Sequence, residues 1–328
     1  MSTMKRILVA IKDLDAASMP AVRKAAQIAM STGATLELFH ALSQSILVDA
    51  LDARRISLKD YENEQITAAL KRLETVAKRI RKHDVEVVCA AEWDFPPAEA
   101  IVRRALKTRA DLIVAERHAT RHVAGWMLAY TDWELLRQAP CAVLLVKLPR
   151  PYHRPVVMTA VDPFHEHAKP SKLDDVLLES SAHLTEALRG TLRIVHCVAP
   201  ASMVTAGWMA GPIVVADTHT DASLKRARQA LAAEVARHPL PSHKLAVVEG
   251  VAREAIPLAA KSMKAQVVVM GALSRSGLKR VLIGNTAEAV LDALPCDVLV
   301  VKPGKFQTKV PRKPRGAQLL ALPTAMTG

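Results

Sequence analysis

The chain has 328 residues, of which half are apolar and only 3% are aromatic, and its formal net charge is +13. This length exceeds one small core and fits two domains of about 150 residues each. The apolar content is sufficient for well-buried cores built from Val, Leu, Ile, Ala and Met, a composition typical of parallel sheets covered by helices. No apolar run reaches the roughly 18 residues of a membrane-spanning helix, so we expect no membrane span.

An excess of basic residues is common in proteins that bind nucleic acid, so we consider nucleic acid as a possible partner. The sequence lacks the interleaved aromatic and basic residues that bind single strands, so we consider nucleic acid an unfavoured partner and expect the charge to lie on solvated helix faces. Cys89, Cys141, Cys197 and Cys296 form no CxxC pair, which is typical of reduced core cysteines. With no signal-peptide pattern at the start, the expected location is cytoplasmic.

The first half alternates short apolar runs with longer amphipathic runs, which predicts a parallel sheet with helices on both faces. The expected strands are residues 6–11, 35–40, 84–91, 111–115 and 142–147, and the expected helices are residues 18–31, 59–82, 97–108 and 132–138.

The pattern restarts after a proline-containing linker, and Val156–Val161 is the expected first strand of the second half. Three pairs of segments recur in the same order, namely 34–40 with 190–196, 110–114 with 265–269, and 139–149 with 294–303. Such recurrence indicates duplication of a whole domain. We therefore predict two tandem α/β domains, residues 1–150 and 151–304, each a doubly wound parallel five-stranded sheet.

The last segment, residues 305–328, has no periodic pattern. Its charged residues are Lys305, Lys309, Arg312, Lys313 and Arg315, with no acid among them. Basic, non-periodic chain ends are commonly unstructured, so we expect this tail to be mostly disordered.

The second half carries a glycine-rich segment after its fourth expected strand. The residues of interest are Gly271, Ser274, Gly277, Gly284, Asn285 and Thr286. Glycine lets backbone N–H groups approach an anion, and the start of a helix favours negative charge. Ligands of open parallel sheets bind at the carboxyl ends of the strands, so this segment is a candidate phosphate-binding loop. The alternative is a tight connection with solvated basic residues.

The loop spacing, Gly-x2-x-x9-Gly counted from Gly271 to Gly284, resembles that of the universal stress protein family. The segments 284–288, 294–302 and 131–141 are similar to tandem-domain members of that family. The resemblance covers about residues 5–303 and implies a Rossmann-like fold of the adenine nucleotide alpha hydrolase-like type, with strand order 3-2-1-4-5 in each domain.

In nucleotide-binding members, an acid after the first strand meets adenine or ribose, and the glycine loop with its following hydroxyl meets the phosphates. The resemblance therefore implies that Asp162 and the residues from Gly271 to Thr286 bind ATP, together with Mg. Two positions depart from the family pattern. Ser274 stands in place of the middle glycine, and Asn285 stands in place of the hydroxyl residue, with Thr286 beside it.

The first half departs further from that pattern. Lys12 stands at the position equivalent to Asp162, and the loop after Glu116 has no glycine before Gly125. Glu116 and Asp132 would repel phosphate. We therefore expect the nucleotide site of the first domain to be degenerate.

Several histidines invite a functional interpretation. His118 and His122 lie four residues apart, but no third ligand accompanies them at metal-site spacing, so we expect no metal. His40 and His196 end the second strand of each repeat, which indicates a shared structural role at the sheet edge.

No catalytic constellation is evident, so we name no catalytic residue and do not favour an enzyme. The sequence predicts a cytoplasmic stress-response binding or adaptor protein that binds ATP or another adenine nucleotide in its second domain. Two alternatives remain open: a slow ATPase or other nucleotide-dependent enzyme, and a module for a protein partner or non-nucleotide ligand with no ATP site.

The resemblance also implies a pairing of the two domains. Homodimers of the family join through their last strands, so we expect residues 142–147 and 297–302 to lie side by side in an intramolecular pseudo-dimer. Burying two apolar edges in this way would protect them from other chains. The sequence leaves open whether the chain also forms a homodimer, and it identifies no protein partner.

Overall fold

The computed structural model describes residues 4–117, 125–164, 173–199, 221–271, 285–303 and 306–320. The chain forms two compact units, which are described separately below. The N-terminal unit contains residues 3–143 together with the chain from residue 307 onward, and the C-terminal unit contains residues 144–306. The boundary falls within the strand at residues 142–146, which is described with the N-terminal unit, where it begins.

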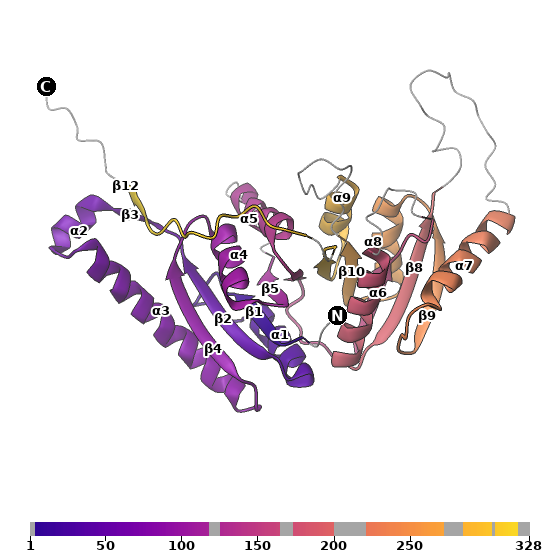
Figure 1. Ribbon diagram of the computed structural model, residues 1–328, viewed down its shortest axis with the longest axis horizontal. Coiled ribbons are helices and arrows are strands. Elements are labelled where there is room, and N and C mark those ends of the chain that lie inside the picture. The colour runs from indigo at the N-terminus through magenta and orange to yellow at the C-terminus, as the bar shows by residue number, and fades with distance from the viewer. Residues whose placement is uncertain are drawn as a thin grey trace, which may run out of the picture. The chain divides into compact units, whose positions relative to one another are not determined.

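The N-terminal unit is built on a parallel sheet (Figure 1). Its strands are β1 (Arg6–Ala10), β2 (Thr35–Leu42), β4 (Val87–Trp93), β5 (Leu112–Glu116) and β6 (Ala142–Val146), and they lie in the order β4-β2-β1-β5-β6. In β1 the consecutive residues Ile7, Leu8 and Val9 are all fully buried. Because successive side chains of a strand point to opposite faces, both faces of this sheet are covered.

Helices cover the sheet of the N-terminal unit on its two faces. They are α1 (Pro20–Thr32), α3 (Leu58–Arg81), α4 (Pro97–Thr108) and α5 (Gly125–Gln138), whereas the short helix α2 (Val48–Arg54) packs against residues 45–47. Pro20 opens α1, and Gly33 ends it with a φ of 71°, a left-handed conformation that glycine adopts without strain. The side chain of Ser57 caps α3 by accepting a hydrogen bond from the amide of Asp60. The short strand β3 (Ser45–Leu47) and α2 were not expected from the sequence.

The C-terminal unit repeats the architecture. Its strands are β7 (Val156–Ala160), β8 (Thr191–Val198), β9 (His243–Glu249), β10 (Val267–Gly271) and β11 (Asp297–Val301), in the order β11-β10-β7-β8-β9. Its helices are α6 (Leu173–Ala187), α7 (Asp221–Val235), α8 (Ala252–Ser262) and α9 (Asn285–Ala293). Counted along the chain and leaving out the short β3, both units have the strand order 3-2-1-4-5, as the sequence predicts.

None of the helices in the described part of the chain combines the length and the apolar character needed to cross a membrane.

The proline-containing linker is anchored to the C-terminal unit by one buried carboxylate. Asp297 is fully buried at the start of β11. Its Oδ1 accepts hydrogen bonds from the backbone amides of Lys147 and Leu148, at 2.8 and 2.9 Å, and its Oδ2 accepts one from the hydroxyl of Tyr152 at 2.6 Å. A buried carboxylate is costly without such donors, so Asp297 fixes the path of residues 147–152.

The C-terminal tail differs from the expectation of disorder. Figure 1 shows residues 306–320 as a yellow trace that passes α4 and ends in β12 (Gln318–Leu320). This strand pairs in parallel with β3, so that Leu319 lies opposite Ile46. Composition alone misses this docking because the partners of the tail lie in a distant part of the chain. Residues 321–328 lie outside the described residues.

Acidic residues of the N-terminal unit hold the basic tail. The backbone amide of Arg315 donates to Asp94 Oδ1 at 2.9 Å, and the Arg315 guanidinium donates to Glu99 Oε1 at 3.0 Å. Asp94 also accepts two hydrogen bonds from Arg103, whose side chain is 5% exposed. Arg103 in turn donates to the carbonyl of Pro311 at 3.4 Å. One buried Arg–Asp pair therefore supports both α4 and the tail.

We predict that Arg103→Ala lowers the free energy of unfolding by about 3–5 kcal/mol, because it leaves the buried Asp94 carboxylate without its cation. The measurement is urea unfolding followed by far-UV circular dichroism. The matched control is Arg72→Ala, which breaks an ion pair with Asp15 whose side chains are 54% and 71% exposed. That change is expected to cost under about 1 kcal/mol. Equal costs for the two variants would contradict the role of Asp94.

Candidate functional site

Each unit has one place where its sheet can form a binding crevice. Helices that follow adjacent strands leave toward opposite faces where the strand order reverses, and this opens a crevice at the carboxyl ends of those strands. The strands at this point are β1 and β5 in the N-terminal unit, and β7 and β10 in the C-terminal unit.

One histidine in each unit, half-buried His40 and buried His196, aligns these two places with each other. His40 Nδ1 lies 2.8 Å from the carbonyl oxygen of Ile11, and His196 Nδ1 lies 3.1 Å from that of Val161. Ile11 directly follows β1, and Val161 directly follows β7. A carbonyl only accepts hydrogen bonds, so Nδ1 is assigned as the protonated nitrogen in both rings. The expected shared structural role of the two histidines is confirmed.

The alignment makes Lys12 the counterpart of Asp162, since each directly follows the carbonyl that the histidine binds. The two units therefore present opposite charges at the same point of the fold. In the N-terminal unit, burial is the main factor that lowers the pKa of Lys12, and it outweighs the opposite effects of Asp132 and Asp13.

Asp162 is the sequence-predicted site residue that the structure describes most fully. Both of its carboxylate oxygens are buried, and neither has a hydrogen-bond partner among the described residues. Its backbone amide lies 3.4 Å from Asp174 Oδ2, at the long limit of a hydrogen bond. A buried carboxylate without a hydrogen-bond partner is costly, so Asp162, which has none in the described part of the chain, is a candidate to accept hydrogen bonds from a ligand.

Gly271 is the last residue of β10, and its lack of a side chain leaves room for a neighbouring residue. A Cβ atom at this position would lie 2.7 Å from Cδ2 of Leu173, the first residue of α6. The absence of a side chain at Gly271 lets the start of α6 pack against the strand. Ser274, Gly277 and Gly284 lie outside the described residues, while Asn285 and Thr286 open α9.

The N-terminal unit has Glu116 at the position of Gly271, since both are the last residue of the fourth strand in their unit. Glu116 Oε1 accepts a hydrogen bond of 3.0 Å from the backbone amide of Ala21 in the first turn of α1. The carboxylate therefore occupies a helix N-terminus that would otherwise attract an external anion.

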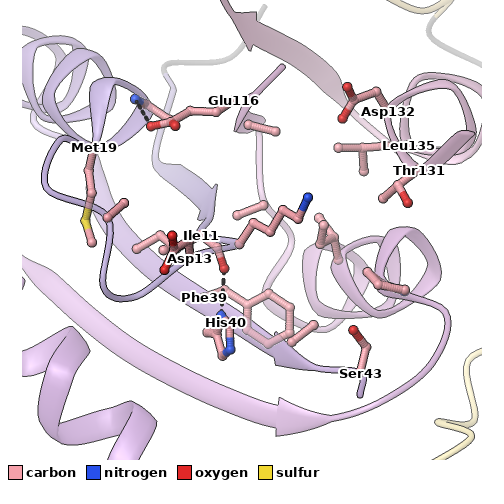
Figure 2. A pocket seen from close by; sticks show the side chains of 18 of the residues that line it. Ile11, Asp13, Met19, Phe39, His40, Ser43, Glu116, Thr131, Asp132 and Leu135 are labelled. Atoms are coloured by element: carbon pink, nitrogen blue, oxygen red, sulfur yellow. Dashed lines mark hydrogen bonds between the residues drawn. The ribbon is translucent and has the colours of Figure 1, made fainter. Parts of the chain in front are cut away.

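A cavity of about 420 Å³ lies at this edge of the N-terminal sheet (Figure 2). Figure 2 shows Glu116 and Met19 on one side of it, and Thr131, Asp132 and Leu135 on the other. The volume falls within the range of small-molecule sites. Five separate chain segments line the cavity. Lys12, Glu116 and Asp132, which the sequence analysis assigned to the degenerate nucleotide site of the first domain, are all part of this lining. The sequence analysis did not predict that a cavity of this size remains there.

Asp132 is the residue of this cavity with the most perturbed acidity. Burial raises its pKa from 3.8 to about 6, against the smaller effects of Arg117 and Lys12, which lower it. Asp132 therefore changes charge near neutral pH and can act as a hydrogen-bond donor when protonated.

We predict that Asp132→Asn stabilises the protein in a pH-dependent way. Between about pH 4 and 6 the folded state binds more protons at Asp132 than the unfolded state does, so stability falls as the pH rises through this window. An asparagine does not ionise. The gain in free energy of unfolding should be near zero at pH 4 and about 1–3 kcal/mol at pH 7, measured by urea unfolding.

The control for this prediction is Asp13→Asn, at an exposed residue of the same cavity. Surface substitutions of this kind change stability by about 0.5 kcal/mol or less. A pH-independent effect of Asp132→Asn would show that burial does not control this carboxyl group.

Comparisons with known proteins agree with the repeat and the fold. This chain is 28% identical over 315 residues to universal stress protein E of Salmonella typhi, and the match covers 94% of this chain and 98% of that protein. It is 27% identical to universal stress protein E of Escherichia coli K12, with the same coverage of both chains. The solved structure of a functionally unknown protein from Pseudomonas aeruginosa PAO1 matches with a TM-score of 0.66 and 25% identity, covering 92% of this chain and 93% of that one.

The family model of universal stress proteins matches twice, at residues 3–147 and 157–302. Together these matches span most of the chain and coincide with the two repeats found in the sequence. The chain therefore belongs to the universal stress protein family, with two tandem domains.

Proposed function

We propose that this tandem universal stress protein is a cytoplasmic binding or adaptor protein that holds ATP or another adenine nucleotide in its second domain. The observation that carries the proposal is the buried Asp162 carboxylate, whose two oxygens have no hydrogen-bond partner among the described residues. It stands just beyond β7, at the carboxyl edge where parallel sheets bind ligands.

The chemistry of Asp162 suits a nucleoside. An ionised carboxylate only accepts hydrogen bonds, so its ligand must supply donors. Ribose hydroxyls and the amino group of adenine are such donors, and the family resemblance gives an acid in this position that role. A ligand that donates to both oxygens removes the cost of burying them.

The phosphate-binding part of the proposed site is the region around the start of α9. Asn285 and Thr286 are the first residues of this helix, whose free N–H groups and dipole favour phosphate. We propose that the Gly271–Thr286 segment binds the phosphates together with Mg. Ser274, Gly277 and Gly284 belong to this proposal through the sequence and the family resemblance.

The first domain lacks the charges for the same ligand. Lys12 stands where the second domain has Asp162, and Glu116 binds the helix amide that faces the crevice. A nucleotide in the first domain would find Lys12 in place of the acceptor Asp162, and its phosphates would meet the carboxylate of Glu116. The proposal therefore assigns one nucleotide per chain, and the two domains act as an intramolecular pair.

A second candidate function rests on the cavity of about 420 Å³ in the N-terminal unit. We propose it as a site for a small non-phosphorylated ligand, because Glu116 and Asp132 disfavour anions there. Ala41 lines the cavity, so Ala41→Phe should fill it. Mass spectrometry of compounds released from the purified protein should then show one that is lost in this variant. Identical profiles would argue against this second function.

The experiment on the nucleotide site uses the full chain. We predict that Asp162→Ala weakens ATP binding at least about tenfold, since it removes two charge-assisted hydrogen bonds. Binding is measured by calorimetric titration with Mg-ATP, and co-purified nucleotide by ion-pair chromatography of the denatured protein. The matched control is Lys12→Ala, at the equivalent position of the other unit, which should bind ATP as the unchanged protein does.

Three results would overturn parts of the proposal. Absence of any Mg-ATP binding by the unchanged protein would exclude the nucleotide site, and equal losses in Asp162→Ala and Lys12→Ala would remove the assignment to the second domain. ATP turnover that Asp162→Ala abolishes would favour an ATPase over a binding protein.

A further inference from the structure

A cluster of three potential metal ligands lies in the C-terminal unit. It consists of Asp175, Glu234 and His238, and one ligand atom from each lies within 4.8 Å of the other two. Asp175 is in the first turn of α6, Glu234 is in the last turn of α7, and His238 follows that helix. None of the three belongs to the residues proposed above to bind nucleotide.

Local structure places Glu234 and His238 on the same side of the chain. They are four residues apart, and helical hydrogen bonds continue beyond the end of α7. The amide of Arg237 donates to the Glu234 carbonyl, and the amide of His238 donates to the Val235 carbonyl. Residues at this spacing are neighbours on a helical surface, which is the arrangement of many two-residue metal-binding pairs.

His238 supplies the independent indication of a ligand. Its side chain is 10% exposed, and its buried Nε2 has no hydrogen-bond partner among the described residues. Asp175 Oδ1 lies only 3.0 Å from Nε2, yet the direction between the two atoms does not make a hydrogen bond. The two atoms form an ion pair when the imidazole is protonated, and they are also close enough for one metal cation to bind both of them.

The carboxylate of Glu234 can serve this cation while keeping its other partner. Its side chain is 8% exposed, and Oε1 contacts the guanidinium of Arg237. A carboxylate has two oxygens, so Oε2 stays available as a ligand. Arg237 then holds the carboxylate in place from outside, as groups around metal ligands commonly do.

We propose that Asp175, Glu234 and His238 form a divalent metal site that binds zinc and connects α6 to the end of α7. One imidazole and two carboxylates suit zinc better than calcium or magnesium, which prefer oxygen ligands alone. Three protein ligands leave a fourth position for water. The inference does not depend on nucleotide binding in the same unit.

The test uses the full chain, freed of metal by a chelator and titrated with zinc in competition with a chromophoric chelator. The unchanged protein should bind one zinc that His238→Gln loses or binds at least about 100-fold more weakly, a larger effect than the tenfold to 100-fold of residues outside the ligand set. The matched control is His243→Gln, at an exposed histidine of the same unit, which should leave zinc binding unchanged.

Two further measurements keep the test decisive. Metal-free His238→Gln should have the same circular dichroism and melting temperature as the metal-free unchanged protein; if it does not, Glu234→Gln replaces it as the test variant. X-ray absorption of the zinc complex should show ligands at about 2.0–2.2 Å with an imidazole signal that His243→Gln keeps. Absence of zinc binding, or equal binding by both histidine variants, would overturn the proposal.

Discussion

The contact between the last residue of the fourth strand and the first turn of the first helix determines what each unit can hold at its sheet edge. In the C-terminal unit this contact is apolar, because Gly271 leaves room for Leu173. In the N-terminal unit it is a hydrogen bond from the amide of Ala21 to Glu116. At the last residue of the fourth strand, the C-terminal unit thus has an apolar contact where the N-terminal unit has a carboxylate.

The duplicated framework around this junction was predictable because it depends on local patterns. Short apolar runs and the recurrence of whole segments gave the strands and the duplication, the family resemblance gave the strand order of both units, and the equivalence of His40 and His196 indicated a shared structural role. That role is a hydrogen bond to a carbonyl near the same edge of the sheet in each unit. In each unit the residue after this carbonyl is Lys12 or Asp162, which agrees with the alignment of these two residues in the sequence.

Features that depend on distant partners were not predictable in this way. The acid that holds the tail, Asp94, lies 221 residues before Arg315, and nothing in the basic tail identifies it. Composition favoured disorder, whereas partly buried and exposed hydrogen bonds and a strand pair hold residues up to Leu320. The size of the cavity in the N-terminal unit was also not predictable, because its lining comes from strand ends and loops that only the fold brings together.

The start of α6 joins the two sites that we propose in the C-terminal unit. Three consecutive residues there have different neighbours: Leu173 packs at Gly271, Asp174 accepts from the amide of Asp162, and Asp175 contacts His238. Successive helical side chains point about 100° apart, so one turn can face a strand, a loop and another helix at once. A shift of α6 on metal binding would change the position of Asp174 and hence the surroundings of Asp162. Any coupling between the two sites would be reciprocal, with nucleotide changing the affinity for zinc by the same factor as zinc changes that for nucleotide.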